Sequence, residues 1–263
     1  MVVDHLTKLK HLSPLIICGA ARSGTRMMTD IVNTHPEISV QEEMHAKTIE
    51  AFFHLKQTID ENFRYYSDRK GVDLSKHWKS SKGALLLSYF TFANKKTELG
   101  HGKELKMYGI KTPGYERYLT EFEDIFEKKP PYYIYCLRNP SSVWRSWKSL
   151  SYLTDYKVFL NRYRRSIRQA IKLKNTVKER FVIFELDSFI KAKDKNSFIL
   201  DNIFARLPIR QDLELMNIEM LENRNSIKRK SGSSYIKDKS LDKELSLIEK
   251  DIKLVELLEI LRN

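Results

Sequence analysis

The most informative part of the sequence is Leu15-Ile-Ile-Cys-Gly-Ala-Ala-Arg-Ser-Gly-Thr25. Its first four residues are an apolar strand, a turn of small residues follows from Gly19, and a helix begins at about Gly24. Such a turn directs backbone N–H groups and the positive end of the helix dipole at one point, which makes an anion site. The spacing Gly19-x-x-x-x-Gly24 is that of a nucleotide phosphate loop. Thr25 stands where a nucleoside-triphosphate enzyme has lysine, and the fixed positive charge is Arg22 inside the loop. We therefore expect a loop that binds an anion but is not built like that of an ATPase.

Length and composition predict a globular chain with anionic ligands. The 263 residues suffice for one large or two small domains, and 41% are hydrophobic. The net charge of +13 suits nucleic acid, an acidic membrane, a nucleotide cosubstrate or a polyanionic glycan. No apolar stretch approaches the roughly 20 residues that span a bilayer, and residues 1–13 lack an apolar signal core. Cys18 and Cys136 lie in apolar runs and are expected to be buried, reduced thiols. Together these features predict a cytoplasmic protein.

Five short apolar stretches are typical of strands buried on both faces of a parallel sheet. They are Leu15–Cys18, Ile38–Gln41, Met107–Ile110, Tyr132–Leu137 and Phe181–Leu186. The helix-like stretches between them are Thr25–Asn33, Ala46–Ile59, Lys82–Asn94, Tyr115–Glu127, Ser141–Leu150 and Tyr156–Lys178. This alternation predicts a doubly wound α/β fold with right-handed crossovers. Ligands of such sheets bind at the carboxyl ends of the strands. The residues that follow the strands are Arg22, Glu43, Lys111, Arg138 and Glu185–Asp187.

A second motif, Arg138-Asn-Pro-Ser-Ser-Val-Trp-Arg-Ser146, follows the fourth strand. Pro140 suits the first turn of a helix and Asn139 can cap it, which places Ser146 two turns along that helix. An arginine and a hydroxyl at this spacing can hold one phosphate by charge-assisted hydrogen bonds. The alternative is an arginine that caps its strand and pairs with a carboxylate. Two anion sites at the ends of neighbouring strands describe a nucleotide with two separated phosphates.

Both motifs resemble those of the sulfotransferases. Arg22-Ser-Gly-Thr25 is similar to their 5′-phosphosulfate loop, and Arg138-Asn-Pro…Ser146 is similar to their 3′-phosphate motif. The resemblance covers about Leu15 to Phe189, with a weaker similarity to about Tyr235. It implies a P-loop-kinase-like sulfotransferase fold, a parallel β-sheet flanked by helices with a helical insertion. It also implies 3′-phosphoadenosine 5′-phosphosulfate (PAPS) as cosubstrate and 3′,5′-ADP (PAP) as product. The implied donor-binding residues in these motifs are Arg22, Ser23, Gly24, Thr25, Arg138 and Ser146.

The resemblance also implies the catalytic residues. The stretch after the loop is closest to the tyrosylprotein, bacterial and glycan-modifying branches, in which a His-Pro element precedes an acidic base. Here His35-Pro36 is followed by Glu42-Glu43, and the register of the tyrosylprotein enzymes favours Glu43 as base, with Glu42 as the alternative. A carboxylate there can accept the proton of an attacking hydroxyl. Lys111 is implied to contact the transferred sulfate or the leaving oxygen. With Arg22 it would supply positive charge, so no metal is expected.

Four further residues are weaker candidates for donor binding. Arg26 stands where the family usually has a small residue, so it either adds charge at the sulfate or points into solvent. The family closes a basic segment over the adenosine and its 3′-phosphate, which makes Arg229, Lys230 and Ser231 candidates; the alternative is a flexible basic loop. Glu185-Leu-Asp187 resembles a family element that we expect to be structural.

We expect a single sulfotransferase domain over residues 1–263, with a helical cap at about 47–94 and a C-terminal helix at about 241–261. In the C-terminal helix, apolar residues alternate at spacings of four and three, as in a dimer seam or a face packed on its own domain. They are Leu241, Leu245, Ile248, Ile252 and Val255. The helix at 156–178 carries a basic face, which is either solvated or an acceptor-binding wall. Its members are Arg162, Arg164, Arg165, Arg168, Lys172 and Lys174.

The predicted function is therefore sulfuryl transfer from PAPS to an acceptor hydroxyl. A carbohydrate such as a polysaccharide or lipid-linked sugar is favoured, and a small metabolite, a lipid or a peptide tyrosine remains open. Tyrosine is disfavoured because the tyrosylprotein enzymes work in the secretory pathway behind a membrane anchor. A P-loop kinase of small metabolites is the alternative enzyme, but it needs lysine at Thr25 and an acidic Mg²⁺ ligand. A nucleic-acid-binding protein needs exposed aromatic residues, whereas Tyr132–Tyr135 is typical of a core strand.

Overall fold

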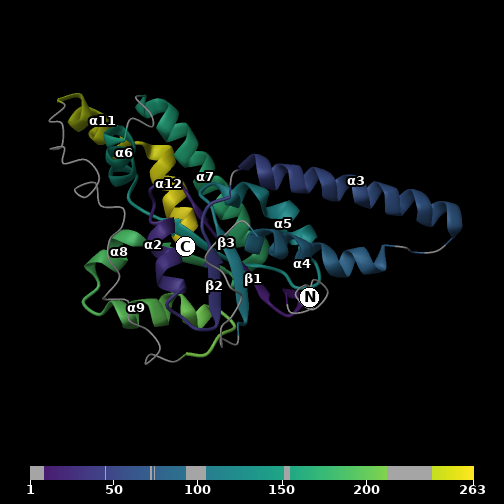
Figure 1. The fold of residues 1–263 in the computed structure, drawn as a ribbon. Helices are drawn as coiled ribbons and strands as arrows, with labels where there is room; N and C mark the ends of the chain where they lie inside the picture. The colour runs from purple at the N-terminus through teal and green to yellow at the C-terminus, as the bar shows by residue number, and fades with distance from the viewer. Residues whose placement is uncertain are drawn as a thin grey trace.

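The computed structural model describes residues 9–44, 46–71, 73, 75–92, 105–150, 155–211 and 239–263. At its centre is a five-stranded sheet in the order β2-β3-β1-β4-β5, in which every neighbouring pair is parallel. Its strands are β1 (Ser13–Gly19), β2 (Ile38–Gln41), β3 (Met107–Lys111), β4 (Tyr132–Leu137) and β5 (Phe181–Glu185). The expected α/β class, a parallel sheet flanked by helices, is confirmed (Figure 1).

Helices cover both faces of this sheet, and each face has its own apolar core. One core is formed with α2 (Thr25–Val32), α8 (Leu186–Lys191), α9 (Lys195–Asn202) and the 3₁₀ turn η3 (Phe204–Arg206). The other is formed with α4 (Lys76–Phe92), η1 (Tyr115–Tyr118), α5 (Leu119–Ile125), α6 (Pro140–Ser149), α7 (Tyr156–Val177), α11 (Lys239–Glu249) and α12 (Ile252–Arg262). Because β1 is buried on both faces, its sequence is a continuous apolar run with no alternation.

The order of the strands places a topological switch point at the ends of β1 and β4. The chain leaves β1 toward β2 on one side of the sheet and leaves β4 toward β5 on the other. Neighbouring strands whose connections diverge in this way form a topological switch point, where open α/β sheets bind ligands. Gly19 of β1 is paired in register with Cys136 of β4, so the loops after these strands start side by side.

A helical pair projects from this body. Helix α3 (Ala46–Lys70) extends away from the sheet, and α4 returns beside it (Figure 1). The Trp78 indole N–H donates to Asp60 Oδ1 at 2.6 Å, which joins the two helices. Both Lys56 and Lys82 form ion pairs with Asp124 of α5, which anchors the pair to the body. The two helices occupy the span of the expected cap. No helix in the described ranges combines the length and apolarity that a membrane crossing requires.

The expected C-terminal helix is wrong in one respect, because it is two helices. The helix is interrupted between α11 and α12. The Asp251 side chain caps α12 by accepting a hydrogen bond from Leu254 N at 2.8 Å. The break rotates the apolar stripe: Ile248 is buried, whereas Ile252 is 73% exposed. Helix α12 instead buries Leu254, Leu258 and Leu261. The stripe that suggested a dimer seam therefore does not lie on one face.

The segment Tyr115–Glu127 also differs from the expected single helix. It begins as the 3₁₀ turn η1 and becomes α-helical only from Leu119 to Ile125. Cys18 and Cys136 are fully buried free thiols, as expected, and burial raises the pKa of each.

An ionic cluster fixes the chain where it enters β2. The Glu37 carboxylate accepts hydrogen bonds from Arg210 N at 2.8 Å and from Arg210 Nε at 2.6 Å, and it pairs with Lys106 Nζ at 2.9 Å. His35 Nδ1 accepts the Glu37 N–H at 3.1 Å, so the His-Pro element is part of the cluster. Burial acts to raise the pKa of Glu37, but the hydrogen bonds from Arg210 and Lys106 outweigh it and lower the pKa to about 2.

This cluster predicts a loss of stability in acid. The unfolded Glu37 carboxyl returns to its ordinary pKa of 4.5, so below this pH the unfolded state binds a proton that the folded state excludes. The stabilisation is present above pH 4.5 and is lost as the pH falls toward 2. Denaturant titrations between pH 6 and 3 should show a smaller acid loss for Glu37→Gln than for the wild type. Glu256→Gln, at an exposed position of α12, is the control and should behave as the wild type. Equal acid losses in Glu37→Gln and the wild type would contradict this prediction.

Candidate active site

The loop after β1 has a backbone that only a few residues can adopt. Gly19 has a φ of 133°, and a Cβ there would lie 2.4 Å from the Cys136 carbonyl oxygen. Gly24 starts α2 with a φ of 101°. Between them, Arg22 adopts a left-handed φ of 72°, which is uncommon for a residue with a side chain and is typical of functional turns. The glycines therefore let β1 turn into α2 within five residues.

Two hydroxyl-bearing residues at the end of this loop, Ser23 and Thr25, are buried. Ser23 is fully buried, yet its hydroxyl has no hydrogen-bond partner among the described residues. Buried hydroxyls are normally paired, so the hydrogen-bonding capacity of this one is available to a ligand. Thr25 is also buried and is the first residue of α2, whose first turn contains no acidic side chain. This arrangement fits an anion held at the helix N-terminus.

Three hydrogen bonds join this loop to the segment after β4. Arg22 Nε donates to Ser146 Oγ at 2.9 Å, and Arg138 Nη1 donates to the Arg22 carbonyl at 3.3 Å. The indole N–H of Trp147 donates to the Ala21 carbonyl at 2.8 Å. Two of the loop's carbonyls and its arginine are thus held by one neighbouring segment. The structure brings together Arg22, Arg138 and Ser146, which the sequence had assigned to two separate motifs.

The start of α6 explains why Arg138 is placed there. Asn139 caps the helix by accepting a hydrogen bond from Ser142 N at 3.2 Å, with proline at the next position, as the sequence predicted. The Asn139 N–H donates to Asp187 at 2.6 Å, and Tyr163 of α7 donates to the Arg138 carbonyl at 2.5 Å. Asp187 therefore holds the turn after β4, in agreement with the structural role expected of its segment.

The two adjacent glutamates after β2 have different partners. Glu43 Oε1 accepts from Lys111 Nζ at 2.7 Å, and the lysine side chain is 3% exposed whereas that of Glu43 is 59% exposed. Glu42 pairs with Arg26 at 3.1 Å. Only Glu43 is therefore in contact with the buried lysine at the end of β3. Arg26, for which the sequence left two readings, is partly exposed and engaged by Glu42.

Two residues that sequence analysis missed contribute to this region. Trp147 holds the Ala21 carbonyl, and Glu116 of η1 accepts the Gly19 N–H at 3.1 Å. Nothing in their local sequence marks either one, because both act on a loop about 100 or more positions away in the chain. Arg229, Lys230 and Ser231 lie outside the described residues.

The basic face of α7 is divided between two environments. Arg164 forms a bidentate pair with Asp251, and Lys174 donates to the Leu261 carbonyl at 3.0 Å, so both pack against α12. The remaining members are exposed: Arg162, Arg165, Arg168 and Lys172.

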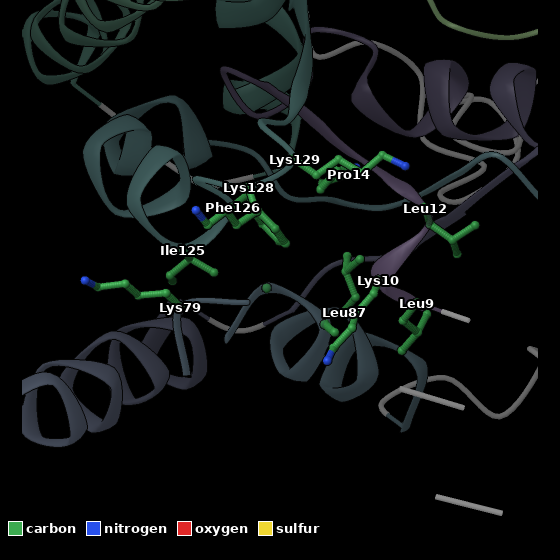
Figure 2. A pocket seen from close by; sticks show the side chains of 12 residues that line it. Leu9, Lys10, Leu12, Pro14, Lys79, Leu87, Ile125, Phe126, Lys128 and Lys129 are labelled. Atoms are coloured by element: carbon green, nitrogen blue, oxygen red, sulfur yellow. The ribbon is translucent and has the colours of Figure 1, made fainter. Parts of the chain in front are cut away.

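A separate pocket lies at the opposite, amino end of the sheet. Figure 2 shows it between the residues before β1, helix α4 and the end of α5, with an apolar lining that includes Leu9, Leu87 and Phe126. The labelled lysine side chains around it, such as Lys79 and Lys129, point in different directions. None of the residues that line this pocket belongs to the loops that follow β1 and β4.

The fold is that of an α/β protein with a strand-to-helix loop, Gly19–Gly24, at its topological switch point. The chain belongs to the sulfotransferase family, whose family model matches residues 14–191. No curated protein sequence matches it. A solved structure of the sulfotransferase domain from the Synechococcus PCC 7002 olefin synthase is similar, with 18% identity and a TM-score of 0.56, over 96% of this chain and 94% of that domain. The sulfotransferase STF9 from Mycobacterium avium is 14% identical with a TM-score of 0.38, over 83% of this chain and 76% of that protein.

The loop geometry predicts a large difference between two glycine substitutions. Gly19→Ala combines a left-handed φ with a clash against Cys136, whereas Gly71, with a φ of 65°, has no described atom within 4 Å of an added Cβ. We expect Gly19→Ala to lower the free energy of unfolding by about 3 kcal/mol and Gly71→Ala by about 1 kcal/mol. Only Gly19→Ala should reduce the rise in melting temperature that low millimolar sodium sulfate produces, at concentrations where the general stabilisation of folded proteins by sulfate is small. Equal losses in the two variants would contradict this account of the loop.

Proposed function

We propose that this sulfotransferase moves a sulfuryl group from PAPS to an acceptor hydroxyl, with 3′,5′-ADP as the second product. The observation that carries the proposal is the contact between the loop after β1 and the Arg138–Ser146 segment. A single nucleotide with a group at its 5′ end and a phosphate at its 3′ position requires two adjacent cationic sites. Arg22 and Arg138 supply one cation each, and the Arg138 guanidinium donates to the backbone carbonyl of Arg22, so it contacts the loop that carries the other cation.

In this proposal the loop binds the 5′-phosphosulfate. The backbone N–H groups of Gly24 and Thr25, at the positive end of the α2 dipole, donate to the anion, and so does the Ser23 hydroxyl, which has no partner among the described residues. The Ser23 N–H itself donates to the Ala20 carbonyl and holds the turn. Arg138 and Ser146 bind the 3′-phosphate by charge-assisted hydrogen bonds. In the structure the Arg22 side chain donates a hydrogen bond to the Ser146 hydroxyl. When the nucleotide binds, its anionic oxygens replace this contact, and each of the two side chains then donates to the nucleotide.

The transfer step then needs a base and stabilisation of charge. The acceptor oxygen forms a bond to sulfur while the bond between sulfur and the bridging phosphate oxygen breaks, and that oxygen leaves with the electron pair as part of 3′,5′-ADP. Glu43 accepts the proton of the acceptor hydroxyl. Lys111 and Arg22 stabilise negative charge on the transferred group and the leaving oxygen. Loss of one such donor costs about 3 kcal/mol of barrier.

The ion pair between Glu43 and Lys111 links donor binding to this base. Lys111 is buried and its ammonium contacts Glu43 at 2.7 Å, so the anionic sulfate of the donor competes with the carboxylate for the same cation. Donor binding thereby releases the exposed Glu43 carboxylate toward the acceptor. In this scheme Arg22 and Lys111 provide the charge that a metal ion provides in kinases, and no metal is required. In the described parts of the chain, no group of three histidine, cysteine or acidic side chains is arranged to hold one.

We favour a carbohydrate hydroxyl as acceptor, on a polysaccharide or a lipid-linked sugar. The net charge of +13 suits a polyanionic glycan. The four exposed cations of α7 offer such a chain a contact surface on the sheet face opposite α2. We place the reaction in the cytoplasm, where the two free thiols stay reduced.

The proposal predicts different effects for the two adjacent glutamates. Glu43→Gln should retain affinity for 3′,5′-ADP but lose turnover by about a hundredfold or more, because the base is removed and the donor contacts are kept. Glu42→Gln, which removes only the pairing with Arg26, is the matched control and should keep most of the turnover. Radiolabelled PAPS incubated with a panel of glycans, lipids and small hydroxyl compounds measures both the acceptor class and the rate. Normal turnover in Glu43→Gln would place the base elsewhere, and a selective loss in Glu42→Gln would assign it to Glu42.

A further inference from the structure

Glu116 lies beneath the anion loop and joins three parts of the core. It is 3% exposed and comes from η1, directly after β3. Its Oε2 accepts the N–H of Gly19 at 3.1 Å, and its Oε1 is 2.5 Å from the hydroxyl of Ser166 on α7. The Ser166 hydroxyl is 2.8 Å from that of Tyr135 on β4. One carboxyl group therefore connects the first residue of the loop to the helix layer and to the next strand.

The N–H of Gly19 needs such a partner because β3 ends too early to provide one. Pairing between β1 and β3 stops at Ile17 and Lys111, and Thr112 N then donates to the Ile17 carbonyl at 3.1 Å. The Gly19 carbonyl accepts from Gly114 N at 2.9 Å. Glu116 completes the set by accepting the Gly19 N–H. The peptide groups on both sides of Gly19 are thus oriented by the segment after β3, at the point where the loop begins.

The charge of Glu116 bears on the loop's ligand. No lysine or arginine forms an ion pair with it in the described residues, and the neighbouring Arg117 is directed to Glu50 and Tyr118 instead. A buried carboxylate without a cation is costly, and such groups tend to take up a proton. A negative charge on Glu116, which is hydrogen-bonded to the first residue of the loop, would in addition repel the anion that the loop binds.

Burial raises the pKa of Glu116 and of the titratable groups that face it. Burial raises the pKa of Glu116 itself, with the hydrogen bonds from Ser166 and Gly19 acting in the opposite direction. Burial also raises the pKa of the facing groups, Cys18 on β1 and Tyr135 and Cys136 on β4.

We propose that Glu116 is a positioning residue for the anion loop and that it carries a proton while the loop holds the 5′ group of the donor. In this state its hydroxyl donates to Ser166 Oγ, the Ser166 hydroxyl donates to Tyr135, and Oε2 still accepts the Gly19 N–H. The carboxyl orients the loop through a neutral hydrogen bond and places no opposing charge behind the anion. This inference rests on the proposed function for the identity of the nucleotide, but not for the anion.

The test compares Glu116→Gln with Glu116→Ala at pH 7, by calorimetric titration with 3′,5′-ADP. The amide of glutamine can accept from Gly19 and donate to Ser166, so Glu116→Gln should bind within about threefold of the wild type. Glu116→Ala leaves a buried N–H unpaired and should bind about tenfold more weakly or worse. With PAPS and an acceptor, its KM for PAPS should rise more than its kcat falls. If Glu116→Ala does not fold, Glu116→Leu, which keeps the bulk of the side chain, takes its place.

Two results would overturn the inference. Binding by Glu116→Ala or Glu116→Leu at wild-type affinity would remove the positioning role. A tenfold change in the affinity of Glu116→Gln for 3′,5′-ADP would contradict the claim that Glu116 is protonated. Tighter binding would show that the wild-type carboxyl is charged and repels the anion, and weaker binding would show that the site requires a charged carboxylate. Titration of the same variants with inorganic sulfate separates the two proposals. A wild type that binds sulfate in a Glu116-dependent way but ignores 3′,5′-ADP would contradict the proposed function and leave this inference in place.

Discussion

The hydrogen bonds between the loop after β1 and the segment after β4 are the constraint on which the rest of the site depends. Arg138 donates to the Arg22 carbonyl, Arg22 donates to Ser146, and Trp147 donates to the Ala21 carbonyl. The sheet order makes these bonds available, because β1 and β4 are neighbours with diverging connections. These hydrogen bonds hold in direct contact two cationic segments that are 116 positions apart in the chain. In the proposed function, this contact positions the two segments for a ligand with two anionic groups.

A second feature follows from the ends of β2 and β3. Because these strands pair in register, Glu43 after β2 lies within contact of Lys111 at the end of β3. Glu42 points to Arg26 of α2 instead. Successive residues of an extended chain point in opposite directions, so adjacent carboxylates separate into two environments. This is a physical reason to prefer Glu43 as the base, independent of any resemblance to other sulfotransferases.

The fold was largely predictable because the strands of a parallel sheet are buried on both faces and therefore have continuous apolar sequences. Each expected strand agrees with an observed one within two residues at either end, and the cap of α6 was read from Asn139 and Pro140. The C-terminal break was missed because the apolar spacing continued across it, although Asp251 is a residue type that caps helices. The residues that contact the loop from distant parts of the chain were harder to predict. The roles of Trp147 and Glu116 depend on tertiary contacts with the loop, and no local pattern encodes them.

The central claim is that one nucleotide with separated 5′ and 3′ anionic groups bridges Arg22 and Arg138. Calorimetric titration of the wild type with 3′,5′-ADP, 5′-AMP and ATP with Mg²⁺ tests it most directly. The account predicts that 3′,5′-ADP binds at least tenfold more tightly than 5′-AMP, because only it reaches both cations, and that ATP with Mg²⁺ binds weakly. Equal affinity for 3′,5′-ADP and 5′-AMP, or a preference for ATP with Mg²⁺, would contradict it.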